Sequence, residues 1–312
     1  MITEEQLAKH NKCITGSKVA SILNLPDAYQ SKYELFAQMK GYTEPDKEAT
    51  ERMKAGNYME LGIEAWCRGE WGWKLKKGPK DGMTHPQHDF IWGLIDRLRT
   101  ENGSPAAVTE FKNVDRFMQP LWEDGPPDKF KTQTYLYMAI YDLPGVIVPC
   151  FGGNHFEKYE LPRNPQVENY IIKKCCEFWD DLQNDKWPDV DDSKSCEETL
   201  KKLYPDHNKN MVAGTEEQLQ LAIEYEKAKA EVKKAEEKKS ELGNKLKDAI
   251  GDNEGILFAG GKDKATWKKT NPKKMKFNEE QFEREDPETY KRYLYLPPGH
   301  RTLRISVKGV EL

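Results

Sequence analysis

The stretch that decides the fold begins with Gly93-Leu94-Ile95-Asp96 and continues, fourteen positions after Asp96, with Glu110-Phe111-Lys112. An acidic residue ends one apolar run, and a Glu-x-Lys sequence lies inside a second. Successive side chains of a β-strand point to opposite faces, so Glu110 and Lys112 share one face. The intervening Glu101-Asn102-Gly103-Ser104 is typical of a hairpin turn. We therefore expect an antiparallel hairpin over residues 88–116.

The length of the connection decides whether the two acids meet. Residues directly opposite in an antiparallel pair point to the same face. A two-residue turn would pair Asp96 with Thr109 and separate the carboxylates, because a one-residue slip reverses every side chain. A connection with an odd number of residues, centred on Gly103, pairs Asp96 with Glu110. We predict the odd connection, and with it two carboxylates beside one lysine, a set of hard oxygen ligands suited to Mg²⁺ or Mn²⁺.

Flanking segments carry two further candidate residues. Residues 50–72 are expected to form a helix in which Glu60 and Glu64 lie one turn apart. Residues 128–143 are expected to form a helix stopped by Pro144-Gly145, and this helix carries Gln133. Residues 1–45 also look helical. Strands are expected over 145–151 and 154–161, followed by a helix over 165–186.

This set of residues fits phosphodiester hydrolysis, which needs an activated water and a sink for negative charge, and bound metal ions supply both. Asp96 and Glu110 are expected to share the metal, with the backbone carbonyl of Phe111 and the carboxylate of Glu60 completing the shell. Lys112 is expected to hold the attacking water or to balance the oxyanion, and Gln133 to lie over the site. The alternative is a solvated ion network on a surface hairpin.

Composition limits the other possibilities. The net charge of −4 excludes a polycationic protein, so contact with nucleic acid must use local basic patches. The one dense basic run holds Trp267 among Lys268, Lys269, Lys273, Lys274 and Lys276; it predicts backbone contact with nucleic acid or a solvated loop. No apolar run approaches the roughly 20 residues of a membrane span, and Met1 to Gln6 has no signal-peptide character. Six cysteines without a Cys-x-x-Cys pair indicate reduced thiols. We therefore expect a cytoplasmic protein.

The composition changes after about residue 190. Residues 215–250 are rich in Glu, Lys, Ala and Leu and are expected to form one long helix with a weak apolar stripe. This helix either packs on its own domain or forms a coiled coil with a partner. Two short strands around Gly260-Gly261, a helix over 278–293 and a last strand over 302–307 are expected to follow.

The motifs together resemble a known family. The order Gly56-x-x-x-Glu60, Asp96, Glu110-x-Lys112 and a Gln133-bearing helix resembles the PD-(D/E)xK nuclease superfamily, and more closely the YqaJ-like viral recombinase family, which includes enzymes like the phage lambda exonuclease. Residues 14–20, Ile-Thr-Gly-Ser-Lys-Val-Ala, resemble the family's N-terminal helix start. Ser17 matches the serine that contacts a terminal 5′-phosphate in such enzymes, and a helix start suits an anion. The proline of the superfamily motif is replaced by Ile95, and the family's phosphate-binding arginine falls near Lys12.

The resemblance implies a fold, a function and a site. The fold is an α/β core with a mixed central sheet flanked by helices: a nuclease domain over 1–190, a linker over 191–214, and a long helix with a small β/α appendage over 215–312. The function is Mg²⁺-dependent 5′→3′ digestion of linear double-stranded DNA, which leaves 3′ single strands for an annealing protein in phage-type recombination. Trimeric rings and a phage or prophage origin are also implied. The catalytic set is Glu60, Asp96, Glu110, Lys112 and Gln133.

Two other functions remain open. One is a RecB-like or restriction-type endonuclease built on the same site. The other is a DNA-binding recombination accessory protein with an inactive site, which is the less favoured reading because every expected catalytic position retains a suitable residue.

Overall fold

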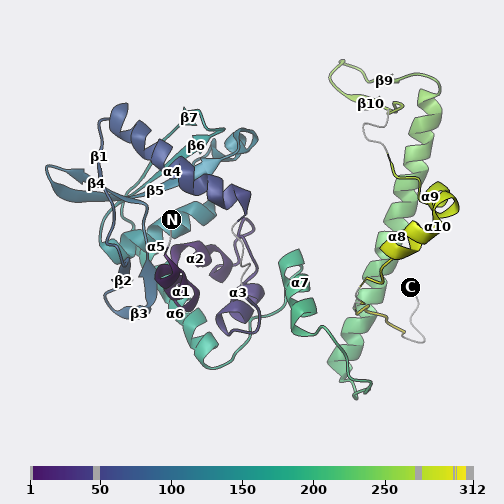
Figure 1. The fold of residues 1–312 in the computed structure, drawn as a ribbon, viewed down its shortest axis with the longest axis horizontal. Coiled ribbons are helices and arrows are strands. Elements are labelled where there is room, and N and C mark those ends of the chain that lie inside the picture. Colours follow the sequence, from purple (N-terminus) through teal and green to yellow (C-terminus); the bar gives the residue numbers. More distant parts are fainter. Residues whose placement is uncertain (1–2, 45–49, 271–275, 298, 300, 307–312) are drawn as a thin grey trace. The chain divides into compact units, whose positions relative to one another are not determined.

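The structure, a computed structural model, describes residues 3–44, 50–270, 276–297, 299 and 301–306. Contacts along the chain define two compact units, residues 1–204 and residues 205–312, which Figure 1 draws in the colours of the sequence. Within the described residues, no helix is both long and apolar enough to cross a membrane.

Unit 1 is built on a mixed sheet with the strand order β1-β4-β5-β6-β7, and β8 also pairs with β6. Strands β5 and β6 are parallel and the other pairs are antiparallel. The strands are β1 (Lys74–Lys76), β4 (Arg97–Glu101), β5 (Ser104–Val114), β6 (Gly145–Phe151), β7 (His155–Phe156) and β8 (Tyr159–Leu161). A mixed α/β core was expected, and the structure confirms it.

Helices cover both faces of this sheet. Helix α4 (Glu51–Gly69) crosses one face (Figure 1), where Ile63 and Cys67 pack with Phe111 and Val148. Helix α5 (Asp128–Tyr141) packs on the other face, where Leu136 joins Val108 in the largest core cluster. The remaining helices of unit 1 are α1 (Glu4–Lys12), α2 (Gly16–Ile22), α3 (Lys32–Met39), the 3₁₀ helix η1 (Arg116–Trp122), α6 (Pro165–Gln183) and α7 (Lys194–Leu203).

The β4–β5 hairpin has the predicted pairing at Asp96 and Glu110, but its turn differs from the prediction. Its turn has two residues, Asn102 and Gly103, both with positive φ, and Glu101 pairs with Ser104. An irregularity then adds one residue to β5, so that Thr100 pairs with Pro105 but Arg99 pairs with Ala107. Arg97 consequently pairs with Thr109, which places Asp96 level with Glu110. The predicted odd connection centred on Gly103 was wrong for the turn itself, which has two residues, but Asp96 lies opposite Glu110 as predicted because the bulge supplies the extra residue.

Other boundaries also differ from the expectations. Residues 88–93 form β3, which pairs with β2 (Met83–His85) in a separate two-stranded sheet, so the main hairpin begins only at residue 97. The stretch expected as a linker, residues 191–214, contains helix α7. Ser195 on α7 accepts a hydrogen bond from the backbone N–H of Ser31 at 2.9 Å, at the start of α3.

Unit 2 contains the long helix α8 (Glu216–Ile250), which begins with a capping box formed by Thr215 and Gln218. The hairpin of β9 (Gly255–Leu257) and β10 (Lys264–Thr266) follows, as expected. The expected single helix over 278–293 is two helices, α9 (Glu279–Glu285) and α10 (Pro287–Tyr293), because Pro287 begins a new helix. The expected strand over 302–307 is wrong for residues 302–306, which have no regular structure; residue 307 lies outside the described residues.

Glycine allows α5 to approach the start of β6. An ideal Cβ on Gly145 would lie 2.6 Å from Cγ2 of Thr134 and 2.8 Å from Sδ of Met138, both on α5. These distances are shorter than van der Waals contact, so a side chain at residue 145 must push α5 away from the sheet.

Replacing Gly145 with alanine is therefore expected to destabilise unit 1 by about 1–3 kcal/mol. Gly62 is the matched control, because it lies inside α4, has no atom within 4 Å of an added Cβ, and should tolerate alanine with a gain of about 0.4–1 kcal/mol. Urea unfolding of both variants measures the difference. Equal free energies of unfolding for the two variants would contradict the close approach of α5 to β6.

Candidate active site

The centre of the site is Glu110, a buried carboxylate on β5. The residue is 5% exposed. The Glu110 Oε1 atom accepts a hydrogen bond from Lys112 Nζ at 2.7 Å and another from Gln133 Nε2 at 2.7 Å. Lys112 also donates to Gln133 Oε1 at 3.2 Å. The shared strand face of Glu110 and Lys112 is confirmed, and the β5–α5–β6 crossover places Gln133 above it.

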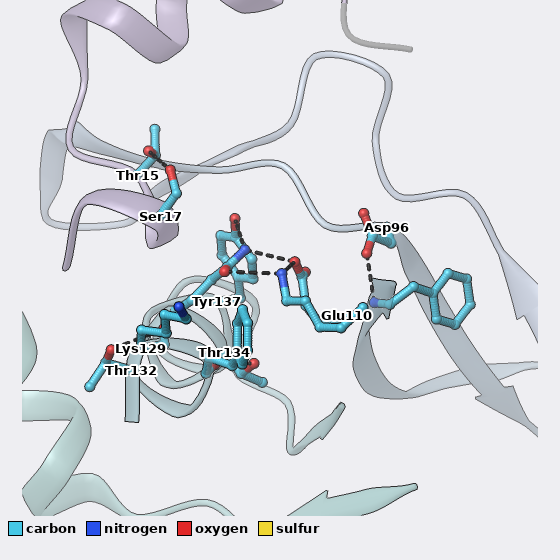
Figure 2. Close-up of polar contacts among 12 residues, drawn as sticks. Thr15, Ser17, Asp96, Glu110, Lys129, Thr132, Thr134 and Tyr137 are labelled. Carbon is cyan, nitrogen blue, oxygen red and sulfur yellow. Dashed lines mark hydrogen bonds and ion pairs between the residues drawn. The ribbon is translucent and has the colours of Figure 1, made fainter. Parts of the chain in front are cut away.

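Asp96 lies immediately before β4, the strand that pairs with β5. Its Oδ2 atom accepts a hydrogen bond from the backbone N–H of Phe111 at 2.7 Å, which ties the acid to β5 beside Glu110 (Figure 2). The Phe111 residue thus contributes its N–H to Asp96 while its ring packs on the opposite face against α4. The hydrogen bond to the backbone of β5 holds the Asp96 carboxylate beside that of Glu110.

Burial raises the pKa values of three acids at this point, and the charge of Asp96 adds to the effect on the other two. Burial, together with the nearby charge of Asp96, raises the pKa of Glu110 to about 8. The same two causes raise the pKa of Glu60, on α4, to about 7. Burial also raises the pKa of Asp96, against the opposing charges of Lys112 and Arg97. Burial by itself lowers the pKa of Lys112, but the charges of Glu110 and Asp96 outweigh it and leave that pKa raised.

This environment suits a divalent cation. The second oxygen of Glu110, Oε2, is buried and has no hydrogen-bond partner, although buried polar atoms are almost always paired. A positive charge between these three acids would stabilise their ionised forms and lower their pKa values. Among the described residues, no three His, Cys, Asp or Glu side chains are already arranged as a metal cage. Two acidic side chains and one backbone carbonyl would leave room for water ligands around a divalent cation.

A second ion-pair network fixes α4 to the start of β4, directly after Asp96. Arg97 is 6% exposed and donates from Nε to Glu64 Oε2 at 2.7 Å and from a terminal nitrogen to the carbonyl of Asp96 at 2.5 Å. Arg68 holds the other oxygen of Glu64. Because Glu64 is one turn from Glu60, this network sets where Glu60 lies.

The candidate phosphate-binding residues lie at the start of α2. Ser17 Oγ lies 3.2 Å from His10 Nε2 and 3.3 Å from Thr15 Oγ1, and Figure 2 draws the contact between Thr15 and Ser17. Burial and the charge of Lys18 lower the pKa of His10 to about 4, so His10 is neutral. Gly16 joins this cluster to the active site, because a Cβ there would lie 2.8 Å from Cγ of Gln133 and 2.7 Å from Cζ of Tyr137.

The lysines predicted to bind phosphate have different environments. Lys12 ends α1 and is exposed. Lys18, which was not predicted to bind phosphate, is buried, and its Nζ donates to the backbone carbonyls of His10 and Cys13 at 2.6 and 2.8 Å. Lys268 and Lys269 belong to unit 2, where Lys268 pairs with Glu254. Their contact with DNA stays a prediction, and Lys273 and Lys274 of the same run lie outside the described residues.

Several residues around the site escaped sequence reasoning. Tyr137 is 6% exposed, and its hydroxyl lies 3.3 Å from Gln133 Nε2; its position four residues after Gln133 was a usable signal. Arg97 was not predicted, although it follows Asp96 directly. Lys129 and Tyr29 form a cation–π pair, with Lys129 Nζ 4.5 Å from the ring. Lys129 is also close to Phe130, which packs under Lys112.

Comparison with known structures identifies the class of fold. A crystal structure of an alkaline exonuclease (LHK-Exo) from Laribacter hongkongensis superposes with a TM-score of 0.50 at 18% sequence identity, covering 59% of this chain and 94% of that one. The structure of LHK-Exo in complex with dAMP matches with the same TM-score and identity over 64% of this chain and 97% of that one. Unit 1 therefore has the PD-(D/E)xK type of fold.

Comparison of sequences identifies the family of the domain. Residues 5–143 match the family described as the YqaJ-like viral recombinase domain. The uncharacterized protein YqaJ of Bacillus subtilis (strain 168) is 26% identical over 278 residues, which are 86% of this chain and 84% of that protein. Residues 5–143 are therefore similar to the YqaJ-like viral recombinase domain, which confirms the resemblance expected from the motifs.

The raised pKa values predict how the metal-free protein responds to pH. A folded-state pKa above the unfolded value of 4.5 gives stability that is complete below about pH 4.5 and is lost as the pH rises through about 7 and 8. The melting temperature in EDTA is therefore expected to fall between pH 6 and pH 9, on the order of 5 °C for the buried Glu110. Mn²⁺ should raise it more at pH 8.5 than at pH 6, because ligands must lose their protons.

Glu110→Gln should flatten this pH dependence, whereas Glu101→Gln, at the exposed hairpin tip, should leave it unchanged. Differential scanning calorimetry provides the measurement. A wild-type melting temperature that stays constant from pH 6 to pH 9 would show that the pKa values of the three acids are not raised in the folded protein.

Proposed function

We propose that this chain is a Mg²⁺-dependent DNA exonuclease that degrades one strand of linear double-stranded DNA in the 5′→3′ direction. The observation that carries the proposal is the buried Glu110, whose one oxygen binds Lys112 and Gln133 while the other has no partner. A structural ion network on a protein surface does not need a buried, unsatisfied carboxylate. The alkaline exonuclease fold and the YqaJ-like domain support the same conclusion.

Asp96, Glu110 and the backbone carbonyl of Phe111 would hold the metal ion, with Glu60 as a further ligand. The ion, when bound, supplies charge stabilisation and a water of lowered pKa. Lys112 keeps its proton because Glu110 and Asp96 raise its pKa, so its ammonium brings a fixed positive charge to the face where the phosphate would lie. Gln133 contacts both Glu110 and Lys112 and thereby fixes their relative positions.

The residues at the start of α2 are the basis for the proposed 5′→3′ direction. Ser17, Thr15 and the neutral His10 offer uncharged hydrogen-bonding groups beside Gln133, and exposed Lys12 offers a positive charge. These groups suit a terminal 5′-phosphate. That LHK-Exo was crystallised with dAMP supports a nucleotide ligand for a site of this fold. The 3′ single strands produced would serve an annealing protein in recombination.

Removing a catalytic group is expected to abolish digestion of linear duplex. Asp96→Asn and Glu110→Gln should lower the rate by orders of magnitude because metal ligands are lost. Lys112→Ala should lower it about 100-fold or more while Mn²⁺ affinity is kept or improved, because a positive charge near the cation is removed. Lys112→Arg should not restore the rate, because a planar fork cannot replace a compact ammonium. End-labelled duplex with Mg²⁺, alongside calorimetry of Mn²⁺ binding, measures both effects.

Glu101→Gln and Lys76→Ala, two exposed positions in the same sheet, are the matched controls and should retain activity. A wild-type rate in Lys112→Ala would refute the assigned site. Cleavage of covalently closed circles would show an endonuclease instead, and no cleavage of any DNA with Mg²⁺ or Mn²⁺ would show an inactive accessory protein.

The 5′-phosphate site gives a separate prediction. Duplex with 5′-phosphate ends should be digested faster than duplex with 5′-hydroxyl ends. Ser17→Ala should reduce the ratio of these two rates about tenfold, which corresponds to the loss of one charge-assisted hydrogen bond. Ser21→Ala is the control, because Ser21 donates instead to the carbonyl of Gln30. Equal rates on both ends in the wild-type protein would exclude the 5′-phosphate site but not the nuclease.

A further inference from the structure

Helix α8 carries an exposed apolar stripe with the spacing of a coiled coil. Starting at Leu221, steps of four and three residues alternate through the whole helix and reach the positions Leu221, Tyr225, Ala228, Val232, Ala235, Lys239, Leu242, Leu246 and Ala249. All nine are exposed, and the larger side chains are 45–67% exposed. A strict alternation of this kind, kept over four heptads, is the pattern by which two helices pair.

The less exposed residues of α8 do not lie on the stripe. They are Ala222, Ile223, Glu226, Ala230, Gly243 and the buried Ile250, which lie beside it. The stripe is about 42 Å long at 1.5 Å per residue. A hydrophobic face of this length has no covering element among the described residues of unit 2.

The stripe is complementary to itself when two copies run in opposite directions. In an antiparallel pair centred between residues 233 and 234, Leu221 lies opposite Leu246 of the second copy, and Tyr225 lies opposite Leu242. Val232 lies opposite Ala235 in the same way. Lys239 faces the small Ala228, which leaves room for its aliphatic stem to cover the stripe while its ammonium reaches water.

The flanking charges select this arrangement. Residues on either side of the stripe face one another across an antiparallel pair, and every charged pair in this register is attractive: Glu224 with Lys245, Glu231 with Lys238, and Lys229 with Glu236. A parallel pair instead opposes Glu231 to Glu236 and stacks Lys239 on itself in the core. Shifting the antiparallel register by one heptad opposes Glu231 or Lys238 to its own copy. Like-charge pairs of this kind exclude the wrong partner more than attractive pairs strengthen the right one.

We propose that α8 is a self-association surface through which two copies of this chain pair as an antiparallel two-stranded coiled coil. Three alanines and a lysine in the stripe make the interface small, so the association is reversible and depends on concentration. The charged residues then determine orientation and register. This interface does not involve Glu110 or its neighbours and is independent of the nuclease proposal.

Charge reversal on the full chain tests the proposal. Glu224→Lys with Glu231→Lys makes this flank entirely positive, and Lys238→Glu with Lys245→Glu makes it entirely negative. Each double variant alone is expected to lose self-association, whereas an equimolar mixture of the two should associate again because the opposite charges now face each other. Sedimentation velocity across micromolar concentrations measures the mass of each sample.

The control is Glu237→Lys with Asp248→Lys, which changes the charge by the same amount as Glu224→Lys with Glu231→Lys but on the outer face of α8, and it should associate like the wild-type chain. Circular dichroism verifies that helix content is retained in every variant. A parallel pair would leave Lys238→Glu with Lys245→Glu unaffected, because those lysines would face Gly243 and Ile250. The proposal is overturned if the wild-type chain is monomeric throughout, if both double variants keep its association, or if the mixture fails to restore it.

Discussion

The burial of one carboxylate, that of Glu110, is the constraint on which the rest of unit 1 depends. A charged group inside a protein needs compensation, and the chain supplies it from two directions, with Lys112 on the same strand and Gln133 on the helix above. The compensation is incomplete, since one Glu110 oxygen has no partner and Asp96 adds a second charge nearby. The protein fold thus stabilises an arrangement that would be unfavourable without a cation or a proton.

The geometry of this arrangement rests on close backbone approaches. Gly145 lets α5 lie against the sheet, and Gly16 lets α2 lie against α5, so a side chain at either position would displace Gln133. Arg97 performs a similar task on the other side, where it binds both Glu64 and the carbonyl of Asp96. In the proposed nuclease, residues that do not touch the substrate would therefore determine the geometry of the site, because catalytic groups act over tenths of an ångström.

Sequence reasoning predicted elements and side-chain faces more successfully than connections. The alternation of Glu110 and Lys112, the Gln133-bearing helix and the long α8 follow from periodicity, which is a local property of the chain. The β-bulge, the separate β2–β3 sheet and the Glu64–Arg97 network depend on contacts between residues distant in sequence, and no local pattern encodes them. The expected strand over residues 302–306 had suitable alternation, but alternation alone does not provide a neighbouring strand to pair with.

The bulge in β5 also has an evolutionary consequence. It lies between the hairpin tip and the site, so the tip can keep a favourable two-residue turn while Asp96 and Glu110 keep their common face. An insertion or deletion at the tip then preserves the pairing of Asp96 with Glu110 only if each strand gains or loses one residue. A single deletion is tolerated only where it removes the bulged residue itself, since the ladder then becomes regular with Asp96 still opposite Glu110. Homologous hairpins should therefore differ by even numbers of residues, except where the bulge has been gained or lost.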